Sequence, residues 1–263
     1  MSVLEWWPEA ATRLLGGSPT LLALDFDGTL APLVDDPEAS RTLPQGQAAL
    51  AALAQVPTLR LALVSGRPAG DLVRLAAPPD ETLIAGSHGA ELGVVQAGRL
   101  ELQPHHLTPA QRSQLASFDK GLTELIQTHG SPAGAWVEHK PVAHVLHTRL
   151  VADAAMAADL TEAAQTLGAT LGAHLLVGKS VVELAVEPAG KAEAIRYLRQ
   201  LIEASIVGFA GDDTTDELAL RTLEPPDVAI RVGPEPTAAE FTLADPPEMC
   251  AFLAYLVERV FPS

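Results

Sequence analysis

The segment Leu21–Gly28, LLALDFDG, constrains the fold more than any other part of the chain. It ends an apolar run with two aspartates, Asp25 and Asp27, and then breaks the run with a glycine. A carboxylate beside a buried run costs free energy unless a group of opposite charge meets it. Residues two apart on a strand point to the same side of the sheet. The segment therefore predicts a buried strand that presents two carboxylates at its carboxyl end.

Short apolar runs alternate with helical patterns on both sides of a central block. We expect strands at 21–26, 59–65, 82–85, 206–210 and 227–232, and helices at 45–55, 71–76, 191–204, 214–222 and 248–260. Strands that alternate with helices indicate a parallel sheet joined by right-handed crossovers. The two flanks of the chain therefore predict one α/β domain with a Rossmannoid parallel-sheet core.

The central block has a different pattern, with helices and hairpins in place of the alternation. We expect helices at 109–129 and 152–167, a hairpin that turns at 141–143, and strands at 173–177 and 180–186. This pattern is typical of a small α+β domain. We therefore predict a core domain at 1–104 and 179–263, interrupted by a cap domain at 105–178.

The bulk composition excludes several classes of partner. The chain has 263 residues, 17 of them basic and 33 acidic, for a formal net charge of −16. This balance argues against binding to nucleic acid or to an anionic membrane surface, both of which need clustered basic residues. The single cysteine, Cys250, excludes a disulfide within the chain, and the sequence lacks a signal-like start or a membrane-length apolar run. We expect a cytoplasmic monomer.

A second acidic cluster, FAGDDTTDE, follows the expected strand 206–210. It contributes Asp212, Asp213 and Asp216. Since the carboxyl ends of parallel strands meet at one edge of a sheet, both clusters are expected to converge there. Carboxylates so close together repel one another unless a cation lies between them, and Mg²⁺ prefers such oxygen ligands. Either cluster alone could be an ordinary strand-to-turn connection with helix-capping aspartates.

Two further residues carry weaker signals. Ser65, in LVSGRP, follows an expected strand and precedes a helix, where a hydroxyl and backbone N–H groups bind phosphate oxygens well. A serine there is also a common helix N-cap. Lys191 occupies the first turn of a helix, against the preference of the helix dipole. It is either a solvated lysine or one directed at the aspartates and a bound phosphate.

These pieces, in this order, resemble the motifs of the haloacid dehalogenase (HAD) superfamily of phosphotransferases. The matching residues are DFDGT at 25–29, Ser65, Lys191 and GDD at 211–213. The resemblance implies that Asp25 is the nucleophile and Asp27 the general acid and base. It implies that Ser65 and Lys191 hold the transferring phosphoryl group. It assigns the Mg²⁺ ligands to Asp25, Asp27 through its backbone carbonyl, and Asp212, with Asp213 beside them and Gly28, Thr29 and Asp216 in support.

Longer strings narrow the resemblance to one family. DFDGTLAPLVDDP, SGRP, GSHGAE, VEHK…HTR, GKSVVEL and GDDTTDE are similar to the trehalose-6-phosphate phosphatases over most of the chain, from Leu22 to Leu218. This similarity implies Mg²⁺-dependent hydrolysis of trehalose 6-phosphate to trehalose and phosphate through an aspartyl-phosphate intermediate. The implied substrate-binding residues are Arg67, His88, Glu138, Lys140, Arg149, Lys179 and Glu183.

Three alternatives remain beside this interpretation. Glu138 and Lys140 share one strand face, and that face could simply be solvated. The substrate could be another sugar phosphate, such as sucrose phosphate or mannosylphosphoglycerate, because capped phosphatases of this kind differ mainly in cap residues. A non-catalytic sugar-phosphate sensor could have the same fold. Such a sensor could lack Asp25 or Asp27, whereas this chain has both.

Three histidines of the expected cap, His139, His144 and His147, raise the question of a zinc site. They lie on two strands joined by a turn, and this spacing does not force them to converge. Histidines on a mixed strand face are usually polar surface residues. The sequence therefore favours a surface interpretation over a metal site here.

Overall fold

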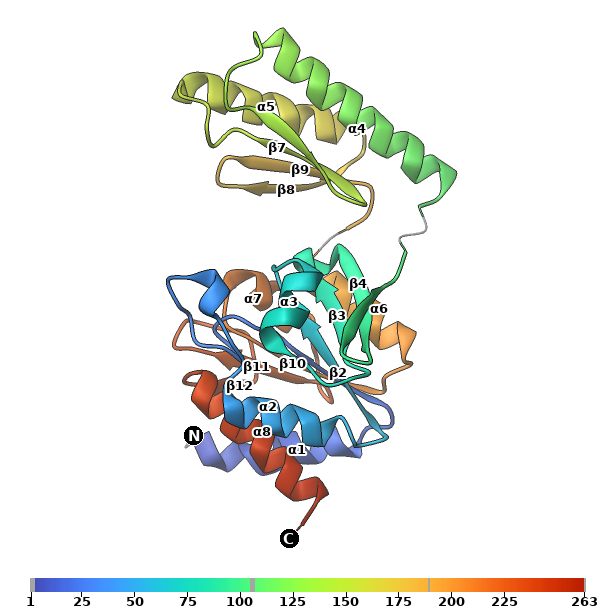
Figure 1. Ribbon diagram of the computed structural model, residues 1–263, viewed down its shortest axis with the longest axis vertical. Coiled ribbons are helices and arrows are strands. Elements are labelled where there is room, and N and C mark those ends of the chain that lie inside the picture. The colour runs from blue at the N-terminus through green and yellow to red at the C-terminus, as the bar shows by residue number, and fades with distance from the viewer. Residues whose placement is uncertain (1–2, 105–106, 189, 263) are drawn as a thin grey trace. The chain divides into compact units, whose positions relative to one another are not determined.

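The computed structural model describes residues 3–104, 107–188 and 190–262 (Figure 1). The chain forms two compact units, Met1–Gln103 with Gly190–Ser263, and Pro104–Ala189. We call them the core unit and the inserted unit. None of the helices in the described ranges is long and apolar enough to cross a membrane.

The core unit is built on an eight-stranded sheet in the order β12-β11-β10-β1-β2-β3-β4-β5. The strands β12 to β3 of this order are parallel, while β4 and β5 form an antiparallel extension at one edge. Their bounds are β1 Thr20–Leu24, β2 Leu59–Val64, β3 Leu83–Gly86, β4 Glu91–Gln96, β5 Arg99–Leu102, β10 Ile206–Gly211, β11 Val228–Val232 and β12 Phe241–Leu243. The parallel α/β core predicted from the sequence is confirmed.

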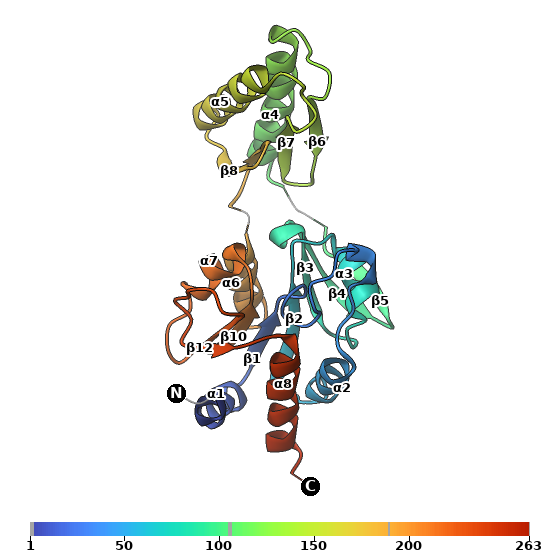
Figure 2. The same cartoon turned by 90° about the vertical axis from the view of Figure 1, so that its left-hand side faces the viewer.

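Helices cover both faces of this sheet (Figure 2). The bounds are α1 Val3–Gly16, α2 Pro44–Leu53, α3 Ala69–Ala76, α6 Lys191–Leu201, α7 Thr214–Leu220 and α8 Pro246–Val260. Alternate residues of β1 divide between two apolar clusters: Leu22 and Leu24 pack with α1, α2, α3 and α8, whereas Leu21 and Ala23 pack with α6 and α7. A strand buried on both faces has no solvent side, which explains its continuous apolar run.

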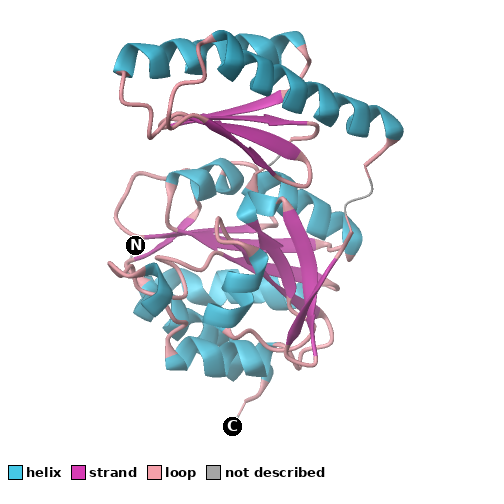
Figure 3. Cartoon of the chain, turned by 45° about the horizontal axis from the view of Figure 1, so that its top comes forward, coloured by secondary structure: helices cyan, strands magenta, loops and turns pink. Residues whose placement is uncertain are grey.

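The inserted unit is a four-stranded antiparallel sheet with two helices on one face (Figure 3). The sheet order is β6-β7-β9-β8, with bounds β6 Trp136–His139, β7 Ala143–His147, β8 His174–Gly178 and β9 Val181–Ala185. The helices are α4 Pro109–Thr128 and α5 Ala154–Thr170. Phe118, Leu122, Leu146, Val182 and Leu184 are fully buried in this small core. The α+β character of the block agrees with its sequence pattern.

The end of the inserted unit differs from the sequence-based boundary. We predicted that the core resumes at residue 179, but β9 pairs with β7 and β8 inside the inserted sheet. The apolar run 180–186 looks the same in sequence as a buried strand of the parallel core, so periodicity could not assign it to a sheet. The other predicted boundary, after residue 104, adjoins residues 105–106, which lie outside the described ranges.

Candidate active site

The two acidic segments predicted to converge follow neighbouring strands of the core sheet. Leu24 at the end of β1 is in register with Ala210 of β10, and the backbone N–H of Asp25 donates to the Ala210 carbonyl at 2.9 Å. Gly28 has φ +75°, and a Cβ atom there would lie 2.0 Å from an Asp212 carboxylate oxygen. Only glycine lets the loop after β1 come so close to Asp212.

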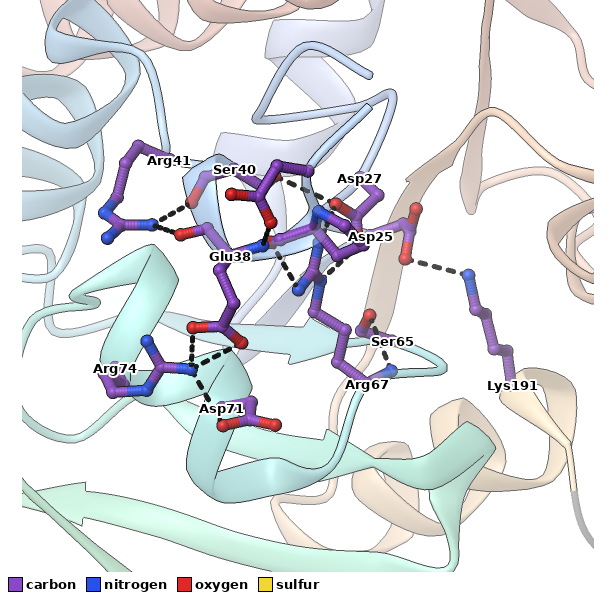
Figure 4. Close-up of polar contacts among 12 residues, drawn as sticks. Asp25, Asp27, Glu38, Ser40, Arg41, Ser65, Arg67, Asp71, Arg74 and Lys191 are labelled. Carbon is purple, nitrogen blue, oxygen red and sulfur yellow. Dashed lines mark hydrogen bonds and ion pairs between the residues drawn. The ribbon is translucent and has the colours of Figure 1, made fainter. Parts of the chain in front are cut away.

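Lys191 links the two segments. Its Nζ donates to Asp25 Oδ1 at 2.8 Å and to Asp216 Oδ1 at 2.6 Å, and its side chain is 2% exposed. Figure 4 shows it directed at Asp25. Burial lowers the pKa of Lys191, but the charges of Asp25 and Asp216 outweigh burial and raise it overall. Of the two interpretations left open by the sequence, the solvated lysine is therefore wrong.

Asp213 and Asp216 are both bound to the start of α7, in different ways. Asp213 Oδ1 accepts from the Asp216 N–H at 2.7 Å and from the Thr215 hydroxyl at 2.8 Å, so it caps the helix. Asp216 Oδ2 accepts from the backbone N–H groups of Asp212 and Asp213, each at 3.0 Å. The carboxylate of Asp213 is thus engaged with the helix, and Asp216, assigned only support from the sequence, lies closer to the centre of the site.

Three carboxylates form a cluster that fits a divalent cation. Asp25, Asp212 and Asp216 each offer an oxygen, and these oxygens lie within 4.8 Å of one another. Burial raises the pKa of Asp25 to about 7 despite Lys191. Burial and the charge of Asp216 raise the pKa of Asp212 to about 6. Burial and the charge of Asp25 raise the pKa of Asp216 to about 7. One lysine does not balance three carboxylates, and hard oxygen donors match Mg²⁺.

The carboxylate of Asp27 lies in a separate network. Arg67 donates from Nε to Asp27 Oδ2 at 2.5 Å and from Nη2 to Oδ1 at 2.7 Å (Figure 4). Ser40 Oγ donates to the same Oδ1 at 2.9 Å. Arg67, predicted to bind substrate, is paired with Asp27 here, and its contact with substrate stays a prediction. The resemblance implies a metal ligand only at the backbone carbonyl of Asp27, so this pairing of the carboxylate does not conflict with it. Ser40 carries no motif, so the sequence did not point to it.

The Ser65 loop is held in place by neighbouring backbone groups. Ser65 is 2% exposed, and its Oγ accepts from the backbone N–H of Arg67 at 3.2 Å. The backbone N–H of His88 donates to the Ser65 carbonyl at 2.9 Å, and the His88 ring packs on Gly66. Glu91 accepts from the Ala69 N–H at 2.8 Å and so caps α3. His88 therefore borders the loop that carries Ser65.

Thr29, predicted to support the site, lies in the loop that follows Gly28. It is fully buried, and its Oγ1 has no hydrogen-bond partner among the described residues.

The inserted unit gathers three of the predicted substrate-binding residues on one sheet face. Glu138 and Glu183 are both in register with Val145 of β7, on the face opposite the helices, since strand residues alternate. Lys140 Nζ donates to Glu183 Oε2 at 2.7 Å, and Glu138 Oε2 pairs with His147 Nε2 at 2.8 Å. The structure therefore supports a shared polar face on this unit.

Arg149 follows the end of β7, and Lys179 lies in the turn between β8 and β9, at one end of the same sheet. Both are exposed, and a hydrogen bond from the Thr148 N–H to the Ser180 carbonyl, 2.9 Å long, joins the segments that carry them. Two exposed basic residues thus lie on adjoining segments that are distant in the sequence.

Residues 23–247 match the family model of trehalose-phosphatase. The chain belongs to this family. A trehalose 6-phosphate phosphatase of Zea mays is 32% identical over 92% of this chain and 71% of its own length. A protein of Mycobacterium tuberculosis described as an uncharacterized glycosyl hydrolase is 35% identical over 93% of this chain. The resemblance inferred from the motifs is confirmed.

The fold is also found among solved structures. A trehalose-6-phosphate phosphatase of Aspergillus fumigatus superposes with a TM-score of 0.75 at 22% identity, covering 96% of this chain and 97% of that one. The HAD-like core predicted from the sequence is therefore confirmed. The chain spans 19% of the length of the Mycobacterium tuberculosis protein and 61% of a trehalose-phosphate phosphatase of Mycobacterium marinum.

Proposed function

We propose that the protein hydrolyses trehalose 6-phosphate to trehalose and phosphate, with Mg²⁺ and through an aspartyl-phosphate intermediate. The observation that carries this proposal is the buried contact of Lys191 with both Asp25 and Asp216, beside Asp212 at the carboxyl edge of a parallel sheet. Membership of the trehalose-phosphatase family supports the substrate.

In the first step, Asp25 attacks phosphorus. Lys191 holds Asp25 Oδ1, which leaves the other carboxylate oxygen to form the new O–P bond as the bond to the sugar oxygen breaks. Ser65 and Lys191 bind the phosphoryl oxygens. Asp25, Asp212 and the Asp27 carbonyl would hold Mg²⁺, which supplies charge neutralisation for the phosphoryl group when bound.

Asp27 moves the protons. In its protonated form it donates to the departing sugar oxygen, and as a carboxylate it then takes a proton from the water that hydrolyses the aspartyl phosphate. Arg67 and Ser40 fix the orientation of this carboxyl group through three hydrogen bonds. They act as positioning residues and do not need to touch the substrate.

The polar face of the inserted unit recognises the sugar. Glu138, Lys140 and Glu183 offer both acceptors and donors to a polyol, and the Lys140–Glu183 pair is already formed. Arg149 and Lys179 add positive charge for an anionic substrate. A cap role for this unit, the cytoplasm as compartment and a monomeric state stay predictions from the sequence.

A phosphate-release screen across sugar phosphates, with Mg²⁺ and with chelator, tests the function. We expect release from trehalose 6-phosphate to exceed release from glucose 6-phosphate and sucrose phosphate, and to disappear with chelator. Equal rates on all sugar phosphates would contradict the substrate assignment. Binding of trehalose 6-phosphate without release of phosphate would instead favour a sensor.

A further inference from the structure

Two histidines of the inserted unit lie directly opposite each other. His139 of β6 and His144 of β7 are in register across a tight turn that the Lys140 N–H closes by donating to the Ala143 carbonyl at 2.8 Å. Their ring centroids are 4.6 Å apart, with the ring planes at 73°. The sequence spacing alone did not require this approach, and the register of the hairpin brings it about.

The helix packed on this face adds a carboxylate. Phe118 and Leu122 anchor α4 in the apolar core. The next residue after Phe118, Asp119, accepts a hydrogen bond from His139 Nε2 at 2.7 Å. Asp119, His139 and His144 each offer one ligand atom, and these atoms lie within 4.8 Å of one another. Ligand atoms of a tetrahedral ion lie about 3.3 Å apart, so an ion here would replace the 2.7 Å contact between His139 and Asp119 with a bond to each.

His144 supplies a second, independent indication of a ligand. The residue is 6% exposed, and its Nδ1 has no hydrogen-bond partner among the described residues. Buried polar atoms in native proteins are nearly always partnered, so an imidazole nitrogen without a partner, on a residue of this cluster, calls for an explanation.

We propose that Asp119, His139 and His144 form a binding site for a divalent transition-metal ion such as Zn²⁺. Two imidazoles and a carboxylate suit Zn²⁺ better than Mg²⁺, which prefers oxygen ligands throughout. Water completes the coordination, because the His139 and Asp119 side chains are 58% and 46% exposed. The ion ties α4 to the hairpin that carries Glu138 and Lys140. This proposal does not depend on the activity of the core unit.

Metal titration of the full chain without a histidine tag tests the site. With Mg²⁺ in large excess to occupy the core carboxylates, we expect calorimetry to show one Zn²⁺ per chain. Co²⁺ in its place should give the strong visible bands of a low-coordinate nitrogen–oxygen site. Zn²⁺ should also raise the melting temperature. No uptake of Zn²⁺ by the unchanged protein would overturn the proposal.

Variants locate the ion. His139→Gln and Asp119→Asn change exposed side chains, so they should fold and melt like the parent protein without Zn²⁺, yet bind Zn²⁺ at least about tenfold more weakly. His174→Gln, an exposed histidine of β8, is the matched control and should bind normally. Asp212→Asn should also keep the Zn²⁺ site. Unchanged affinity in His139→Gln, or loss of uptake in Asp212→Asn, would contradict the assignment.

Discussion

The charged groups of the core edge and those of the inserted sheet differ in burial and in balance. The side chains of Asp25, Lys191 and Asp216 are 5%, 2% and 0% exposed, whereas those of Glu138 and Lys140 are 47% and 27% exposed. In the core, one lysine faces a cluster of carboxylates. On the inserted sheet the charges are paired one to one. The core edge thus holds fixed, buried charges of the kind that the proposed cation and phosphoryl group require, and the inserted face holds more exposed charges of the kind that the proposed sugar recognition requires.

The largest effect should follow from removing the nucleophile of the core. Asp25→Asn keeps the size of the side chain but removes the charge that Lys191 binds and the oxygen that attacks phosphorus. We expect kcat to fall at least about a thousandfold on both trehalose 6-phosphate and an aryl phosphate. Asp35→Asn, an exposed aspartate of the following loop, is the matched control and should leave kcat unchanged. Near-normal turnover by Asp25→Asn would remove the basis of the mechanism.

The imbalance of charge in the core predicts how Mg²⁺ binding depends on pH. Burial and mutual repulsion raise the pKa of Asp25 and Asp216 to about 7 and that of Asp212 to about 6, so the metal-free site holds protons that an ion must displace. We expect Mg²⁺ affinity, followed by calorimetry in several buffers, to rise up to about tenfold per pH unit for each proton released between pH 6 and 7.

Stability without Mg²⁺ should have the opposite trend. The ordinary pKa of these carboxyl groups is 3.8, so between about pH 4 and 7 these three groups hold more protons in the folded protein than in the unfolded chain. The contribution of these three groups to the free energy of unfolding therefore falls as the pH rises through this range. Urea titrations across the range check this sign. The variant Asp212→Asn should weaken both the pH dependence of Mg²⁺ affinity and the pH dependence of stability. If neither pH dependence changes in this variant, the three carboxyl groups do not titrate as described.

A smaller and more selective effect is expected on the inserted sheet. Glu183→Ala removes an acceptor for sugar hydroxyls and leaves Lys140 without its partner. We expect kcat/KM for trehalose 6-phosphate to fall about tenfold, the size of one lost charged hydrogen bond, with little change on an aryl phosphate. Glu162→Ala, an exposed glutamate of α5, serves as control. Equal losses on both substrates would assign Glu183 a structural role.

The two units also differ in how much of their sites the sequence could predict. Each core aspartate follows a continuously apolar strand, so the parallel topology alone brings Asp25 and Asp212 together. β12, with three residues, gave no pattern to detect. Asp119 meets His139 only through the packing of α4 on a hairpin, and Ser40 reaches Asp27 from an irregular loop. Contacts of this kind depend on tertiary packing, which has no local signature in the sequence.

The smallest expected effect tests whether Asp27 acts on the leaving group. Ser40→Ala removes one of three hydrogen bonds to the Asp27 carboxylate and leaves both bonds from Arg67. We expect kcat/KM for trehalose 6-phosphate to fall about threefold. An aryl phosphate has a good leaving group that needs no proton, and kcat/KM reports only steps up to its departure. That substrate should therefore be unaffected by Ser40→Ala. A loss of equal size on both substrates would mean that Ser40 supports the attack by Asp25 and not the proton transfer by Asp27. Asp27 would then belong to the same network as the carboxylates of the core edge.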